Sequence, residues 1–310
     1  LITKEAMVWN ESDQGMTYQS IPIPADLIDI VDEARGKLIE AVADYDEALL
    51  EKYFEDPDSI SVDEIRVAIR KAVIDLAFTP VMCGSAFKNK GVQAVLDAVC
   101  AYLPCPLDVE AIKGINPKND AEMIRLPNVN EPFTALAFKI ATDPFVGRLC
   151  FIRVYSGTIS EGHYVYNSTQ NIKERINRLV KIHADHKEQV KEVSAGNLGA
   201  IVGIKKSATG DTLCDEKNPI ILEKTVFPEP VISMRIEPKT KADLEKLGIV
   251  LKKLQEEDPI FKVRTDEETL DVIISGMGEL YLEVLVDRMR REFGVDINVG
   301  KPQVAYRETI

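Results

Sequence analysis

The spacing of apolar residues changes near residue 130 of this 310-residue chain, and that change limits the folds it can adopt. Between Asp26 and Phe54 the apolar residues recur at steps of three or four, as on one face of a helix. Between Phe133 and Asp215, short runs rich in β-branched and aromatic residues alternate with turns, which suits a small antiparallel barrel. A third pattern fills residues 229–301. The sequence therefore predicts a multidomain α+β protein.

The first hundred residues read as mainly helical. Asp26–Phe54 predicts a helix, and Gly36 marks the point where we expect it to weaken or break. Ser61-Val-Asp-Glu64 has the pattern of a capping box, so another helix is expected to begin there. Pro80–Val99 predicts a strand, a short loop and an amphipathic helix. Residues 108–130 and 217–229 read as linkers, because they hold Pro, Asn and charge but little apolar pattern.

Residues 229–301 follow the order β-α-β-β-α-β of a ferredoxin-like unit. The helices are expected at Lys241–Glu257 and Glu279–Phe293, with Gly294 as the C-terminal cap of the second. RNA-recognition modules have the same order, but they stack bases on aromatic residues of their central strands. The run "LDVIIS" has no aromatic residue, so we expect no base stacking here.

The net charge of −13 is concentrated at the start of the chain. Residues 1–60 hold 15 acidic and 4 basic side chains, a net of −11, and the other 250 residues hold 36 and 34, a net of −2. The acidic part repels phosphate and suits a basic protein partner, although a solvated surface is the simpler alternative. The charge-free stretches are too short to span a bilayer, so no membrane contact is expected. Five scattered cysteines indicate a reducing, cytoplasmic setting.

Two groups of cations are candidates for RNA or ribosome contact. The first surrounds Ile176 and Leu179, where phosphate contact competes with a solvated strand that carries charged residues; it consists of Lys173, Arg175, Arg178 and Lys181. The second lies on the last helix, where pairing with Glu283, Asp287 and Glu292 is the alternative; it consists of Arg288, Arg290 and Arg291. His183 and His186 have too few partners for a metal site, so we expect none.

The loop of Ser85, Ala86 and Phe87 lies between a strand and a helix, as does the last guanine-contacting loop of a GTPase. The sequence contains no G-x-x-x-x-G-K-[ST] and no D-x-x-G, so the phosphate-binding motifs are absent from this chain. Asn89-Lys90-Gly91 imitates the guanine-reading N-K-x-D, but Val92 replaces the aspartate. By itself the loop is a weak signal.

Taken together, long stretches of the chain resemble bacterial translation elongation factor G, a family of ribosomal translocase GTPases. They are "CGSAFKNKGVQ", "TDPFVGRLCFIRVYSG", "AGNLGAIVGIK", "TGDTLCD", "GMGELYLEVLVDRMRREFGV" and "VGKPQVAYRETI". The resemblance covers essentially all 310 residues in the family's order. It implies an internal fragment that lacks most of the GTPase domain and domains IV and V.

The resemblance also implies a domain plan. Residues 1–106 would be the C-terminal part of a P-loop GTPase domain with its inserted subdomain, and residues 107–220 the β-barrel domain II. Residues 229–301 would be the ferredoxin-like domain III, and residues 302–310 the first strand of domain IV.

The implied function is GTP-dependent translocation of tRNA and mRNA during protein synthesis. The full-length protein would be a GTPase using GTP or GDP with Mg; we expect neither a bound cofactor nor catalytic residues in this fragment. The backbone near Ser85 and Ala86 would touch the guanine, with Phe87 packing beneath. The implied partners of a monomeric protein are ribosomal RNA, small-subunit proteins and, through the acidic inserted subdomain, the ribosomal stalk protein.

One residue departs from the family's pattern. The family usually reads "GELHLE", and this chain has Tyr281 in place of the histidine. With Leu285, Tyr281 marks a candidate pocket for fusidic acid or an interdomain contact. The departure leaves open a paralogue with altered GTPase coupling. A tetracycline-resistance-type ribosome protection protein, release factor three and a stand-alone ribosome-binding adaptor also stay open.

Overall fold

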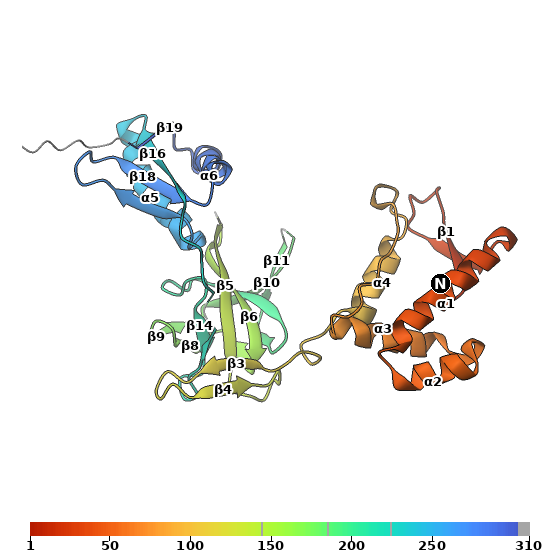
Figure 1. Cartoon of the computed structure of the whole chain (residues 1–310). Coiled ribbons are helices and arrows are strands. Elements are labelled where there is room, and N and C mark those ends of the chain that lie inside the picture. Colours follow the sequence, from red (N-terminus) through yellow and green to blue (C-terminus); the bar gives the residue numbers. More distant parts are fainter. Residues whose placement is uncertain (144, 185, 224, 303–310) are drawn as a thin grey trace, which may run out of the picture. The chain divides into compact units, whose positions relative to one another are not determined.

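The acidic N-terminal region folds into a hairpin and a group of helices (Figure 1). In this computed structural model, which describes residues 1–143, 145–184, 186–223 and 225–302, the contacts divide the chain into the units Leu1–Glu110 and Ala111–Ile310. The elements of the first unit are β1 (Glu5–Trp9), β2 (Tyr18–Pro22), α1 (Ile28–Ala43), α2 (Glu47–Glu55), α3 (Val62–Ile74) and α4 (Val92–Tyr102), with short 3-10 turns at Ala25–Leu27, Pro57–Ser59 and Ala86–Lys88.

The helix expected between Asp26 and Phe54 is broken well after Gly36. Gly36 lies inside α1, and α1 ends before Asp46, whose side chain accepts hydrogen bonds from the N–H groups of Ala48 and Leu49 at the start of α2. The prediction of a break at Gly36 is therefore wrong, because one interior glycine costs a helix only about 1 kcal/mol.

The capping box at Ser61 is confirmed. Ser61 Oγ accepts from the N–H of Glu64, and the Glu64 carboxylate accepts from the N–H of Ser61 at 2.9 Å. The helices that follow pack on one apolar cluster, which includes Ile39, Val42, Leu49, Ile65, Ile69 and Tyr102. The acidic side chains of α1 and α2 are left on the outside; the exposed ones include Asp32, Glu33, Glu40, Asp44, Glu47, Glu51 and Glu55.

The second unit begins with antiparallel strands around one core. Its main sheet has the order β11-β10-β13-β6-β5-β14-β8-β9, and β12 pairs with β7 separately. The strands are β5 (Thr134–Asp143), β6 (Gly147–Ser156), β7 (Thr158–Ser160), β8 (Tyr164–Asn167), β9 (Ile172–Arg175), β10 (Arg178–His183), β11 (His186–Val190), β12 (Glu192–Ser194), β13 (Leu198–Val202) and β14 (Thr212–Cys214). Alternate residues from these strands meet in one cluster, the arrangement expected for the barrel.

The stretches read as linkers are structured. β3 (Ile112–Ile115), β4 (Glu122–Arg125) and β15 (Ile221–Leu222) form a three-stranded sheet in the order β15-β3-β4. Gly114 permits this pairing, because a Cβ there would lie 2.6 Å from the carbonyl oxygen of Ile221. The linker prediction is therefore wrong for these residues. Its signal was weak because the partner strands are about a hundred residues apart in the sequence.

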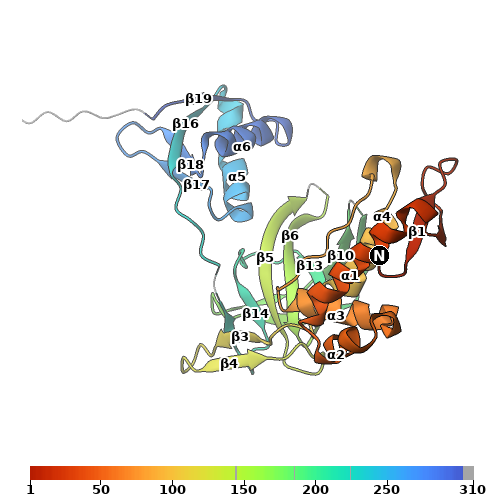
Figure 2. The same ribbon diagram turned by 45° about the vertical axis from the view of Figure 1, so that its right-hand side comes forward.

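The predicted β-α-β-β-α-β order is confirmed. The elements are β16 (Ile232–Pro238), α5 (Lys241–Glu257), β17 (Lys262–Thr265), β18 (Val272–Gly276), α6 (Glu279–Arg291) and β19 (Ile297–Gly300), and the sheet order is β17-β18-β16-β19. Both helices cover the same face of this sheet (Figure 2). β16 and β19 are antiparallel neighbours, and Arg235 pairs with Gly300, so this ferredoxin-like unit begins and ends at one place.

Most of the strand expected to begin domain IV, residues 303–310, lies outside the described residues. Among the described residues, no helix combines the length and the apolar character needed to cross a membrane.

Candidate functional site

The loop that carries Ser85 is tightly folded on its own backbone. The N–H of Ser85 donates to the carbonyl oxygen of Lys90 at 2.9 Å, and the N–H of Lys90 donates back at 3.0 Å. A Cβ on Gly84 would lie 2.7 Å from the carbonyl oxygen of Lys90, so a larger residue would push the two sides apart. The backbone N–H groups near Ala86 are thus presented on a closed turn.

The β1–β2 hairpin holds this loop from one side. The Gln93 amide donates to the carbonyl oxygens of Gly15 and Met16 at 3.0 and 3.2 Å, and Trp9 Nε1–H donates to Gln93 Oε1 at 3.3 Å. Lys90 also pairs with Glu11 at 2.9 Å. The sequence motifs gave no sign of this support, because the hairpin is more than 70 residues away from Lys90.

Phe87 does not pack beneath the loop. Its side chain is fully exposed, at 101%. It borders a cavity of about 300 Å³ together with Glu11, Gln14, Gly15, Lys88 and Lys90. Gly15 of the hairpin lies against the backbone of Lys88 and Asn89, which follow Phe87 in the chain. The packed position that the resemblance implied is therefore not found.

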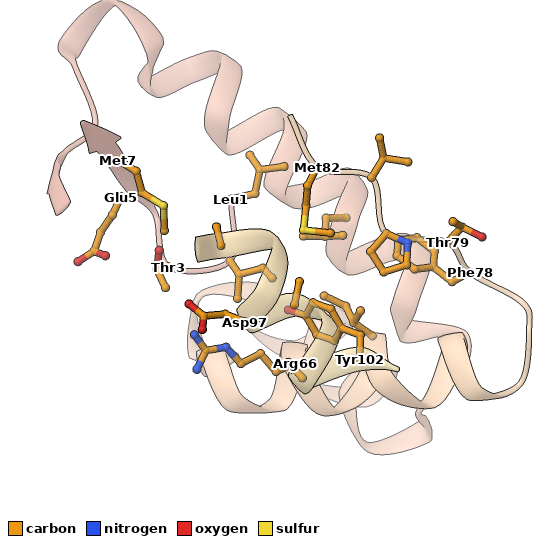
Figure 3. A pocket seen from close by; sticks show the side chains of 18 residues that line it. Leu1, Thr3, Glu5, Met7, Arg66, Phe78, Thr79, Met82, Asp97 and Tyr102 are labelled. Carbon is orange, nitrogen blue, oxygen red and sulfur yellow. The ribbon is translucent and has the colours of Figure 1, made fainter. Parts of the chain in front are cut away.

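A larger, mostly apolar cavity of about 840 Å³ lies elsewhere in the first unit. Its walls come from α3, α4, the first residues of the chain and the segment Phe78–Met82 (Figure 3). Phe78, Met82 and Tyr102 line it, and burial raises the pKa of the Tyr102 hydroxyl. Ser85, Ala86 and Phe87 are not among its lining residues, so it is distinct from the candidate nucleotide loop.

The four barrel cations lie on two strands. Lys173 and Arg175 belong to β9, Arg178 and Lys181 belong to β10, and all four side chains are exposed. Ile176 and Leu179 between them are buried, as the alternation predicted. Lys173 pairs with Glu216 at 2.5 Å and lies 5.6 Å from the centre of the Tyr164 ring. The arrangement leaves these cations open to solvent, which is compatible both with phosphate contact and with a solvated strand.

The loop 205–207 beside β9 is held by one carboxylate. Glu174 accepts from the N–H groups of Lys205, Lys206 and Ser207 at 2.8–3.0 Å and from the Ser207 hydroxyl at 2.6 Å. Burial alone would raise the pKa of Glu174, but these hydrogen bonds outweigh burial and hold it below its ordinary value. Lys205 and Lys206 are therefore fixed at an exposed place that no sequence motif indicated.

The three arginines of α6 all have partners within their own unit. Arg288 pairs with Glu257 and Glu292 at 3.0 Å, and Arg291 pairs with Asp287 at 2.9 Å. Arg290 donates to the carbonyl oxygen of Ile297 at 2.9 Å. The hydrogen bonds that Arg288 donates to Glu292 and Glu257 raise its pKa, against the opposing effect of burial. Pairing within the chain, the alternative to ribosome contact, is thus found for all three arginines. Arg291 is nevertheless 80% exposed.

Tyr281 and Leu285 belong to the interior of the ferredoxin-like unit. Tyr281 Oη donates to Asp258 Oδ2 at 2.7 Å, and its ring lies so close to Gly276 that a Cβ there would be 2.3 Å away. Burial, followed by the Asp258 hydrogen bond, raises the pKa of Tyr281. Leu285 is buried in the same core. Neither side chain borders either of the two cavities described above, and the drug or interdomain pocket considered from the sequence stays a prediction.

No group of three or more metal-ligating side chains is found in the described part of the chain, and His183 and His186 are exposed. Cys83, Cys100 and Cys105 are free and exposed, whereas Cys150 and Cys214 are free and buried.

Two family models match consecutive parts of the chain. Residues 132–216 match "Elongation factor G domain 2", and residues 227–301 match "Elongation Factor G, domain III". The elongation factor G proteins of Cytophaga hutchinsonii and Amoebophilus asiaticus are each 58% identical to the chain over all 310 residues. The chain belongs to the elongation factor G family. It spans 44% of the length of both relatives, so less than half of a family member is represented here.

A crystal structure from Thermus thermophilus has the same fold, with a TM-score of 0.77 and 24% identity over 98% of this chain and 42% of that one. Both named relatives support membership of elongation factor G rather than the ribosome protection proteins considered from the sequence.

Proposed function

We propose that this chain is part of a GTPase that promotes the translocation of tRNA and mRNA on the ribosome. The observation that carries the proposal is the 58% identity to elongation factor G over all 310 residues. The expected setting is the cytoplasm, and the expected state is a monomer. The direct test is a translocation assay with the complete gene product, in which ribosome-dependent GTP hydrolysis without movement of tRNA would contradict the proposal and favour a paralogue.

The domain plan remains part of this proposal. Residues 1–106 would complete a GTPase domain and carry its inserted subdomain, residues 107–220 would be domain II, and residues 229–301 domain III. The matched ranges 132–216 and 227–301 support the last two assignments.

In the complete protein GTP or GDP would bind with Mg, and the residues of this chain fit one edge of that site only. The closed turn at Ser85 and Ala86 offers backbone N–H groups to a guanine, whereas the sequence contains no phosphate-binding loop. One or two such hydrogen bonds contribute roughly 1–3 kcal/mol, and even millimolar affinity takes about 4 kcal/mol. We therefore expect calorimetry to detect no binding of GDP to this chain. A micromolar dissociation constant would contradict the assignment.

Ribosome contact is proposed through the second unit. The exposed cations of β9 and β10, namely Lys173, Arg175, Arg178 and Lys181, would meet ribosomal RNA phosphates, and Arg291 is the most accessible cation of α6. Small-subunit proteins would also be met in this region. The acidic surface of α1 and α2 would meet the stalk protein, since its charge repels phosphate.

The salt dependence of ribosome binding tests the RNA part of this proposal. If about three phosphates are neutralised, log affinity should fall with log salt at a slope of roughly −2 to −3. Charge reversal of Lys173, Arg175 and Lys181 should flatten the slope. The matched control reverses three exposed lysines elsewhere in the unit, Lys118, Lys217 and Lys252. Equal slopes in the two triple variants would place the RNA contact on another surface.

A further inference from the structure

The C-terminal end of α5 has an unfavourable charge for a helix. It ends in Glu256 and Glu257, Asp258 follows, and its last turn contains no basic residue. Carboxylates at this end of a helix are repelled by the unpaired carbonyl groups of the last turn. Where a sequence breaks such a local rule, a gain elsewhere in the fold is expected.

The gain comes from the β5–β6 hairpin, which belongs to the same compact unit. The N–H of Thr142 donates to Glu257 Oε1 at 2.8 Å. Arg148 Nε lies 3.3 Å from Glu256 Oε2, an ion pair without the geometry of a hydrogen bond. Thr142 and Arg148 are directly opposite each other on β5 and β6. One cross-strand pair of the hairpin, Thr142 and Arg148, therefore contacts the two successive glutamates Glu256 and Glu257.

The hairpin side of this contact is held in place by the barrel. The other guanidinium nitrogens of Arg148 donate to the carbonyl oxygens of Ile204 and Ser207 at 2.8 and 2.6 Å. Asp143, next to Thr142, accepts from Lys187 and from the N–H groups of Val146 and Phe145. These bonds, the one from Lys187 first, lower the pKa of Asp143 to about 2.

The helix side is held separately. Glu257 Oε2 accepts from Arg288 Nη2 at 3.0 Å, and Arg288 is also bound by Glu292. If the helix end moved away from the hairpin, Glu257 would still accept the hydrogen bond from Arg288. Arg148 would still donate to the carbonyl oxygens of Ile204 and Ser207. The Glu256 side chain is already 37% exposed, so water can replace its partner. Opening would thus leave Glu257 paired, whereas Arg148, whose side chain is 16% exposed, would lose its counter-charge and keep two carbonyl acceptors.

We propose that Glu256 and Glu257 form a releasable electrostatic latch between the barrel and the ferredoxin-like unit. The closed state is held by charge and one backbone hydrogen bond, and the open state keeps the remaining bonds of both sides. A device of this kind responds to ionic strength and to any partner that binds one state better than the other. It depends on neither nucleotide nor ribosome, so it stands apart from the proposed function.

The test measures a distance distribution by electron spin resonance in the 310-residue chain. Spin labels are attached at Lys191→Cys on the barrel and Glu245→Cys on α5, both exposed, after Cys83, Cys100 and Cys105 are replaced by serine. Cys150 and Cys214 remain, since burial raises the pKa of both thiols, that of Cys150 to about 12, and keeps them unreactive. Glu257→Gln and Glu256→Gln, alone and together, are compared with Glu283→Gln, which removes an exposed charge from α6.

We expect one main distance in the parent chain at low salt. Raising the salt, or introducing Glu257→Gln, should increase the population at longer distances relative to the population at the main distance. The expected increase is roughly tenfold, the size expected for loss of a charge-assisted hydrogen bond. Glu283→Gln should leave it unchanged. Glu256→Gln removes only the ion pair with Arg148 on the barrel. A changed distance distribution in this variant, with an unaltered circular dichroism spectrum, therefore separates opening from unfolding. Distributions that are identical in every variant and at every salt concentration would overturn the latch.

Discussion

Replacing Tyr281 by phenylalanine removes one hydroxyl and should loosen the start of α6. That hydroxyl donates to Asp258 at 2.7 Å and thereby ties the first turn of α6 to the C-terminal cap of α5. Phenylalanine keeps the ring against Gly276, so the substitution isolates the hydrogen bond from the packing.

The expected loss of stability follows from the charge of the acceptor, Asp258, and from the burial of the two side chains. A hydrogen bond to a charged group contributes about 1.5–3 kcal/mol to stability, and the half-buried position of both partners lowers our expectation to about 1–2 kcal/mol. In a unit of this size each kcal/mol shifts the melting temperature by about 4–8 °C. We therefore expect the ferredoxin-like unit to melt roughly 4–16 °C lower in the variant.

The effect should also depend on pH in a particular direction. The pKa of Tyr281 is raised in the folded chain, so the native state holds the phenol proton more tightly than the unfolded state. Its contribution is complete below the ordinary tyrosine pKa of about 10 and declines as the pH rises above it. The stability difference between the parent chain and Tyr281→Phe should therefore shrink as the pH rises above about 10.

Scanning calorimetry across this pH range is the assay, and Tyr164→Phe is the control. Tyr164 is 62% exposed on β8, so its replacement should leave every transition in place. Equal melting temperatures for the parent and Tyr281→Phe would refute the reasoning. A difference that stays constant through pH 11 would show that the phenol proton does not account for it.

Three further substitutions test other contacts. Gly276→Ala should cost about 1–3 kcal/mol, because its Cβ would meet the Tyr281 ring at 2.3 Å, whereas Gly278→Ala, with open space around it, should cost far less in the same melting experiment. Ser61→Ala should lower the stability of the first unit by about 1 kcal/mol in urea unfolding, with α3 fraying at its start; an unchanged midpoint would show that the capping box is redundant. Glu174→Gln should speed amide hydrogen exchange in the loop 205–207, since a neutral amide replaces one acceptor oxygen by a donor. Because the pKa of Glu174 is lowered in the fold, the parent loop should itself lose protection as the pH falls below about 4.5, and exchange that is equal in both chains at pH 7 would contradict the assigned contacts.

Features encoded within a few neighbouring residues could be predicted from the sequence. The Ser61–Glu64 capping box and the order of strands and helices from Ile232 to Gly300 are of this kind. The break between α1 and α2 was not predicted: it lies at Asp46, whose side chain caps α2, ten residues after Gly36.

Contacts between distant residues could not be predicted in this way. β3 and β15 have only four and two residues, too few to show a pattern until their pairing is known. Arg288 has its partner Glu257 on a preceding helix, 31 residues away, and helix spacing points only to Glu292. The strand expected before the Ser85 loop is wrong, because residues 80–84 form no strand and Ser85 makes only an isolated bridge with Lys90. At the candidate site, only the helix that follows the loop, α4, was predicted correctly. The hairpin that supports the loop and the outward direction of Phe87 depend on tertiary packing.

The adjacent ends of the ferredoxin-like unit determine how it would respond to a pulling force. The chain enters through β16 and leaves through β19, and these antiparallel neighbours have their outer ends together at Arg235 and Gly300. Tension on the two flanking segments would load the inter-strand hydrogen bonds one pair after another, as in opening a zipper, instead of all at once in shear. The unit should consequently yield at low force, starting with β19, while the cluster beneath α5 and α6 is still intact. A domain placed between two moving bodies would then act as the mechanically compliant element of the chain.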